Sequence, residues 1–191
     1  MSRPTRHALK IAAAALSLGA LLAPVAAQAQ GWQFLPLLND PGYKPEPSVA
    51  LTVDRVDPGQ GSSVDAYGLD VNVNCGLIQS PDKRIRTHIN LSASDDAGVK
   101  TSNFELSPRY TLPLAGMPGL SLGAGPSLGL FKVQASGAAS RTLTGVGLAA
   151  GINYRSGAFY AGADLRKHST SAKDGVDLDP LTWGVKVGVN F

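Results

Sequence analysis

The sequence contains one cysteine, three histidines and few aromatic residues, which make up only 6% of its 191 positions. A lone Cys75 cannot close an internal disulfide, and so few histidines and thiols cannot be assembled into a metal site by spacing. Beyond position 30, no apolar run approaches the ~18 residues that a membrane-spanning helix needs. These absences exclude a disulfide-stapled domain and a helical anchor in that region, and we expect no metal and no cofactor.

Residues 1–29 have the three parts of a secretory signal. A basic start is followed by an apolar run from Ile11 to about Ala23, and the segment ends in the small-x-small site Ala27-Gln28-Ala29. The rival interpretation, a transmembrane anchor, fails because the run is short and ends in a cleavage site. No pair of adjacent arginines is present, so we expect export through the general secretory route.

Removal of the leader changes the charge balance. The chain has 17 lysines and arginines against 14 acids, and Arg3, Arg6 and Lys10 lie within the first 29 residues. The exported chain is therefore close to neutral, and no basic patch indicates a nucleic-acid partner. Its length fits one domain.

The last eleven residues alternate strictly between apolar and polar types. Positions 181, 183, 185, 187, 189 and 191 carry Leu, Trp, Val, Val, Val and Phe, whereas the positions between them carry Thr, Gly, Lys, Gly and Asn. In a strand these two sets lie on opposite faces. A strand of this length crosses a bilayer at a barrel tilt, with aromatic residues at both ends of the apolar face.

Seven further segments show the same period of two, which gives eight predicted strands: 48–56, 67–77, 84–93, 104–112, 120–134, 142–154, 159–167 and 181–191. An even number returns the chain end to the starting side, as closure requires. The predicted fold is all-β, an eight-stranded antiparallel up-and-down transmembrane β-barrel over residues 48–191. We expect short turns at one end and longer, more polar loops at the other, including 94–100.

Several positions break the pattern. The alternation slips near Leu130-Phe131, which predicts a bulge or a strand end. Pro108 and Pro126 each remove a hydrogen-bond donor inside a predicted strand. Cys75 shares an alternating face with Val71 and Val73, which predicts a small, lipid-facing side chain.

Residues 30–47 form a proline-rich segment that fits no strand. It contains the apolar cluster Trp32, Phe34, Leu35, Leu37 and Leu38. We predict a periplasmic extension, either a plug or, in the simpler interpretation, a loosely ordered approach to the first strand.

The leader, the alternating segments and the ending Gly184-Val185-Lys186-Val187-Gly188-Val189-Asn190-Phe191 resemble the small bacterial outer-membrane β-barrel superfamily. OmpA-like, OmpX-like and opacity-type proteins, often called porin-family barrels, belong to it. The resemblance implies an integral outer-membrane protein of the Gram-negative cell envelope, contacting outer-membrane lipids as a monomer. It also implies that the barrel-assembly machinery reads the C-terminal strand ending at Phe191.

With the apolar face toward lipid, the polar face points into the barrel. The inward set then comprises Asp54, Asp70, Arg84, Arg86, His88, Glu105, Arg109, Asp164, Arg166, His168 and Lys186. An eight-stranded barrel is just wide enough for side chains to fill it, and buried charges must be paired. We therefore predict a structural ion-pair network, with a narrow polar pore of weak activity as the open alternative.

The stretch His168-Ser169-Thr170-Ser171, near Asp174, Asp177 and Asp179, supplies the residue types of a hydrolytic triad. Some small outer-membrane barrels are lipid A deacylases, but their motif, a histidine two residues before a serine followed by asparagine, is not matched because Thr170 holds that position. We predict a non-enzymatic barrel of structural or surface-interaction type, without catalytic residues. A lipid-modifying enzyme that uses the His168 region is the alternative.

Overall fold

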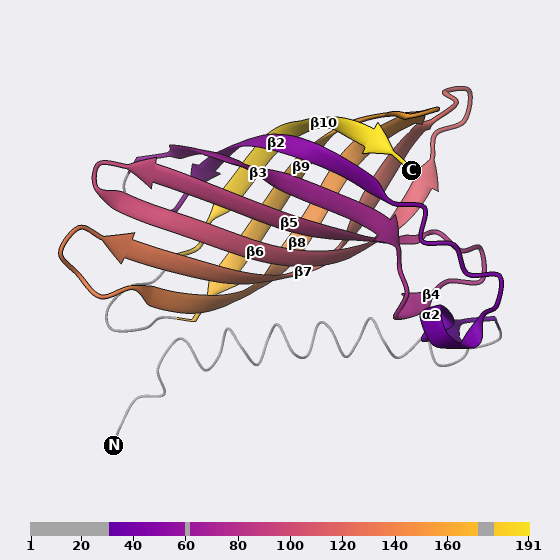
Figure 1. Ribbon diagram of the computed structural model, residues 1–191, viewed down its shortest axis with the longest axis horizontal. Helices are drawn as coiled ribbons and strands as arrows, with labels where there is room; N and C mark the ends of the chain where they lie inside the picture. Colours follow the sequence, from indigo (N-terminus) through magenta and orange to yellow (C-terminus); the bar gives the residue numbers. More distant parts are fainter. Residues whose placement is uncertain (1–30, 60–61, 172–177) are drawn as a thin grey trace, which may run out of the picture.

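Eight antiparallel strands close into a barrel in the computed structural model, which describes residues 31–59, 62–171 and 178–191. The order around the barrel is β10-β2-β3-β5-β6-β7-β8-β9 (Figure 1). The strands are β2 (Ser48–Asp57), β3 (Val64–Asn74), β5 (Ile85–Asp96), β6 (Val99–Pro113), β7 (Leu120–Ala135), β8 (Arg141–Ser156), β9 (Phe159–Thr170) and β10 (Leu181–Asn190). The prediction of a closed eight-stranded all-β barrel is confirmed.

The barrel closes by pairing its last strand with its first. The register between β10 and β2 runs from Leu181 opposite Asp57 to Asn190 opposite Ser48. We call the end of the barrel at Ser48 and Asn190 the terminal end, and the opposite end the loop end. Figure 1 shows the terminal end on the right. The predicted leader, residues 1–29, lies outside the described residues, and within these no helix is long and apolar enough to span a bilayer.

The alternation predicted for β10 separates the two faces of the wall. Val187 is 53% exposed on the outside, whereas its neighbour Lys186 is 4% exposed inside. The same separation holds on the partner strand, where Leu51 is exposed and Thr52 is buried. On both strands the polar residues at mid-barrel therefore face the interior, as the sequence predicts.

The predicted register slip at Leu130-Phe131 is wrong. β7 pairs with β8 in one unbroken register from Leu120 opposite Tyr154 to Val133 opposite Arg141. Leu130 is exposed and Phe131 is 2% exposed, so the alternation continues and the phenylalanine points inward. Glycines give it room, since a Cβ at Gly129 would lie 2.5 Å from its ring and one at Gly145 would lie 2.8 Å away.

Both strands continue through their prolines. The pairing between β6 and β7 stops after Leu106 opposite Leu128 and resumes at Tyr110 opposite Ala124 in the same register, which would put Pro108 opposite Pro126. On the inner side of this gap, the Ser107 hydroxyl donates to the Ser127 hydroxyl at 2.7 Å. The lost ladder bonds thus interrupt the sheet locally without ending either strand.

The connection between β5 and β6 is shorter than the predicted loop over 94–100. It consists of Ala97 and Gly98, with φ of 47° and 80°, which is a tight hairpin turn with both central residues left-handed. Asp95 and Lys100 lie opposite each other in the ladder and form an ion pair at 3.4 Å. Polar residues that the sequence assigns to a loop therefore extend the strands.

The segment before β2 has structure that the sequence analysis missed. The short strand β1 (Gln33–Phe34) pairs with β4 (Ile78–Gln79), which lies within the connection between β3 and β5, and α2 (Pro36–Asn39) follows β1. This unit lies beside the terminal end (Figure 1). The expectation that 30–47 contains no strand is wrong.

This segment also explains the position of Cys75, which was predicted to face lipid. β3 ends at Asn74, and Cys75 is 2% exposed, with its N–H donating to the Ile85 carbonyl at 2.9 Å. The adjoining Gly76 lies against Tyr43, since a Cβ there would be 3.2 Å from the phenol oxygen. The prediction is therefore corrected: Cys75 lies beyond the alternating strand and is buried.

Candidate functional site: the barrel lumen

The barrel interior gathers nearly all of the predicted inward-facing charges. Asp54, Asp70, Arg86, His88, Glu105, Arg109, Asp164, Arg166, His168 and Lys186 have buried or partly buried side chains that contact one another or other interior groups. Arg84 is the exception, because β5 begins one residue later. Its side chain is 42% exposed and pairs with Asp82 at 3.3 Å outside the lumen.

Lys186 is the centre of the larger of two interior clusters. Its Nζ lies 2.6 Å from Asp164 Oδ2 and 3.2 Å from Asp70 Oδ1. Arg109 donates to the other oxygen of Asp164, and His88 Nδ1 lies 3.2 Å from the Asp70 carboxylate. These side chains come from β3, β5, β6, β9 and β10, so the cluster joins different sides of the barrel across the lumen.

Arg166 organises the second cluster. Its Nη2 lies 2.8 Å from Asp54 Oδ2, and its Nη1 lies 3.4 Å from Glu105 Oε2. Thr52 donates to Asp54 at 3.4 Å from the same strand. All three charged side chains are at most 3% exposed. Buried charges of one sign are costly without partners, and here each carboxylate is next to a cation.

The structure brings together three potential metal ligands that sequence spacing did not connect. One ligand atom from each of Asp70, His88 and Asp164 lies within 4.8 Å of the others. The Lys186 ammonium is within 3.2 Å of all three residues. The position that a metal cation would take among these ligands is thus held by the protein's own cation.

A polar layer follows toward the terminal end. The Tyr160 hydroxyl donates to Asn153 Oδ1 at 2.7 Å and accepts from Asn72 Nδ2 at 3.1 Å. Arg86 donates to Asn72 Oδ1 at 2.6 Å and to Asn74 Oδ1 at 2.6 Å. Tyr160 is fully buried. The predicted inward set holds only charged residues and histidines, so it does not include Tyr160.

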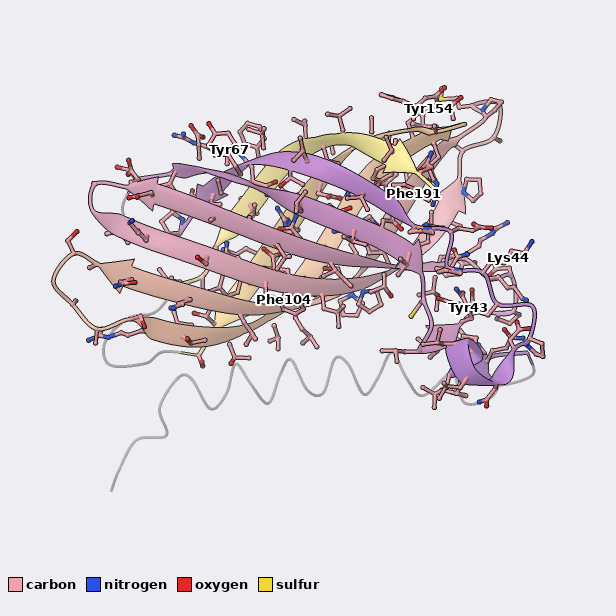
Figure 2. All side chains as sticks on the ribbon, viewed as in Figure 1. Tyr43, Lys44, Tyr67, Phe104, Tyr154 and Phe191 are labelled. Atoms are coloured by element: carbon pink, nitrogen blue, oxygen red, sulfur yellow. The ribbon has the colours of Figure 1, made fainter. Side chains whose placement is uncertain are left out.

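The chain before β2 contacts the terminal end of the lumen. Arg86 donates to the Glu46 carbonyl at 2.7 Å, and Arg155 donates to the same oxygen at 3.2 Å. Asn74 donates from its side chain to the Lys44 carbonyl, and the Tyr43 hydroxyl donates to the Asn74 carbonyl at 2.7 Å. Partial burial raises the pKa of Tyr43, which keeps its phenol a donor. Figure 2 shows Tyr43 and Lys44 on this segment.

His168 and Ser169, weighed as members of a hydrolytic triad, lie on opposite faces of β9. His168 is 1% exposed inside the barrel, whereas the adjacent Ser169 is exposed on the opposite face. Asp174 and Asp177 lie outside the described residues, and the carbonyl of Asp179 accepts a hydrogen bond from Lys167.

His168 instead lies next to a serine from another strand. Its Nε2 is 2.9 Å from the Ser127 hydroxyl and 3.9 Å from Glu105 Oε2, while Nδ1 has no hydrogen-bond partner among the described residues. A catalytic histidine needs the acid on the nitrogen opposite the nucleophile. Here both contacts are on one nitrogen, in a side chain without solvent access.

The comparisons with known proteins agree on architecture. No protein-family model matches the sequence, and no curated protein matches it. Among solved structures, the chain is similar to Neisserial surface protein A (NspA), with a TM-score of 0.51 and 15% identity over 75% of this chain and 94% of that chain.

A second similar structure is the N-terminal β-barrel domain of OprF from Pseudomonas aeruginosa. The TM-score is 0.50 and the identity 18%, covering 78% of this chain and all of that domain. At these identities the likeness concerns the fold alone. The chain has the fold of the small eight-stranded outer-membrane β-barrels.

Proposed function

We propose that this protein is an integral outer-membrane barrel of structural or surface-interaction type, exported through the general secretory route. In this proposal its lumen is a packed core that neither conducts nor catalyses. The observation that carries the proposal is the charged network around Lys186 and Arg166, which crosses the middle of the lumen with paired side chains from β2, β3, β5, β6, β9 and β10.

The outer surface supports the membrane location. Every strand presents at least one large apolar side chain that is 42–69% exposed: Leu51, Leu69, Leu91, Phe104, Leu128, Leu148, Leu165 and Val187. Such a continuous apolar band is a liability in water but matches hydrocarbon. Figure 2 shows Tyr154 and Phe191 at the terminal end and Tyr67 nearer the loop end, as aromatic girdles at two interfaces would be.

A conductance measurement tests the lumen's role. We expect the refolded barrel in a planar bilayer to give no steady current above that of the bare membrane, because paired charges and Tyr160 occupy the ion path. The double variant Arg109→Ser with Asp164→Ser removes one charge of each sign, and with them both ion pairs of Asp164, and should give a measurable current. A parent barrel that conducts as well as this variant would sink the proposal.

We also propose that Phe191 is a contact for the barrel-assembly machinery. Its ring is 75% exposed, and in the folded barrel its backbone N–H donates to the Pro47 carbonyl at 2.9 Å. Because the ring is mostly exposed, the folded barrel depends little on its contacts. An unpaired final strand, by contrast, must be held until the barrel closes.

Deletion of Phe191 should therefore slow insertion in cells and leave protease-sensitive chain in the periplasm. In detergent, the truncated protein should refold nearly as the parent does. Phe159→Ala removes another exposed ring at the same end and serves as control, with little effect on insertion rate expected. Insertion of the truncated chain at the parent's rate, measured by pulse-chase and protease digestion, would refute this role.

A further inference from the structure

A cavity of about 360 Å³ opens at the loop end of the barrel. Its walls include Val56, Val64, Val99 and Val133, with Phe131 and Asn103 deeper in. We propose that this cavity binds a small neutral amphiphile, with an apolar body between the valines and one hydrogen-bond-donating group directed at Asn103. The proposal goes beyond the structural role above, and binding and conductance are measured independently.

The lumen changes character along its axis. Around Lys186 and Arg166, the inward positions are charged, as the sequence analysis expected for the whole interior. Toward the loop end, the inward positions of β2, β3, β6 and β7 carry Val56, Val64, Val99 and Val133. An opening that only faces water would need no apolar lining. A concave apolar lining with a few polar groups is typical of a small-molecule site.

Phe131 forms the floor of this cavity. Its ring fits over Gly129 and Gly145 and makes an edge-to-face contact with His168, with ring centroids 5.2 Å apart at 69°. Below it lie Ser127 and Glu105, next to His168. The ring thus separates the apolar cavity from the charged clusters, so a ligand can enter without disturbing their ion pairs.

Asn103 selects for ligands that carry a hydrogen-bond donor. It is 8% exposed and lines the cavity. Its Nδ2 lies 3.5 Å from the Ser92 hydroxyl, while Oδ1 has no hydrogen-bond partner in the part of the chain that the structure describes. An unpaired buried amide oxygen is unfavourable until a donor reaches it. It therefore favours a ligand with an O–H or N–H at one end.

The carboxylate of Asp96, near the rim of the cavity, further restricts the class of ligand. Asp96 also lines the cavity, and its carboxylate would repel an anionic head group. Fatty-acid carboxylates are thus disfavoured, whereas alcohols, phenols and aromatic amines fit. Since cavities of about 150 Å³ hold one benzene ring, a cavity of this size admits two or three fused rings.

The test uses the full barrel in phospholipid nanodiscs and the fluorescent probe 1-aminoanthracene, whose emission rises in an apolar site. We expect saturable binding above the linear background from bilayer partition. Val133→Trp fills the cavity and should abolish the saturable part. Lys132→Trp, the neighbouring change on the exposed face of β7, should leave it intact.

Asn103→Leu tests the head-group contact. It should weaken binding of 1-aminoanthracene by roughly five- to tenfold, the effect of one hydrogen bond. Displacement of the probe by anthracene, which has no donor, should be unchanged. If Asn103→Leu left both ligands unaffected, the assigned role of Asn103 would be wrong.

Equal saturable binding in the parent and in Val133→Trp would overturn the cavity proposal, as would a signal that never saturates. Val64→Phe, which fills the cavity from β3, provides a second variant if Val133→Trp fails to fold. Folding of each variant is checked by the shift in gel mobility between heated and unheated samples.

Discussion

Lys186→Met should destabilise the folded barrel by about 3–5 kcal/mol, the cost of leaving buried charges without a partner. The methionine keeps most of the side-chain volume but removes the ammonium that lies between Asp70 and Asp164. Arg109 still contacts Asp164, so the larger share of the loss should come from Asp70. Urea titration of folding in phospholipid vesicles measures the change.

Two further variants separate charge from packing. Lys100→Met removes the exposed pair with Asp95, whose side chains are 71% and 61% exposed, and should cost about 1 kcal/mol or less. Asp70→Asn introduced into Lys186→Met should restore part of the lost stability. If Lys186→Met cost no more than Lys100→Met, the lumen network would not be a stabilising core.

Val187→Arg should destabilise the barrel by about 2–4 kcal/mol, because it places a cation near the middle of the hydrocarbon layer. Val187 lies between Leu51 and Ala161 on the neighbouring strands, with half of its surface on the outside. Its backbone conformation and ladder bonds can persist in the variant, so the loss should reflect the membrane alone.

Val189→Arg is the matched control, since it changes the same residue type on the same face close to the end of β10. A cation there can reach the interface and should cost roughly 1 kcal/mol or less. Unfolding free energies are compared in vesicles of one lipid composition. Equal values for Val187→Arg and the parent would refute the assignment of this face to lipid.

The two faces of the barrel could be predicted because the period of two is a property of the extended backbone. Once Leu181–Asn190 is a strand, Val187 and Lys186 must lie on opposite sides. The slip predicted at Leu130-Phe131 is wrong because a large apolar side chain can lie on the inner face here, in the space that Gly129 and Gly145 leave for its ring. The prediction also failed at Cys75, which is buried beyond the last residue of its strand.

The charged residues of the lumen could be predicted, but their pairing could not. Lys186 and Asp70 are 116 positions apart, and only the tilt and closure of the barrel bring them within 3.2 Å. The prediction that Arg84 faces the lumen is wrong by one position, because β5 starts at Ile85. The apolar loop end was missed for a related reason. In the sequence, each of its inward-facing valines reads only as a residue that favours a strand. The valines form one apolar lining only when four separate strands bring them together.

The contact between Glu46 and two arginines implies an order of assembly. Arg86 and Arg155 are on β5 and β8, and both donate to the one carbonyl. Arg155 is 109 positions away from Glu46, so this contact forms only after most of the chain has been arranged, and loop closure over such a separation is slow. The Glu46 carbonyl can accept from both arginines only when β5 and β8 are already in position, so this contact reports that the surrounding wall is in place.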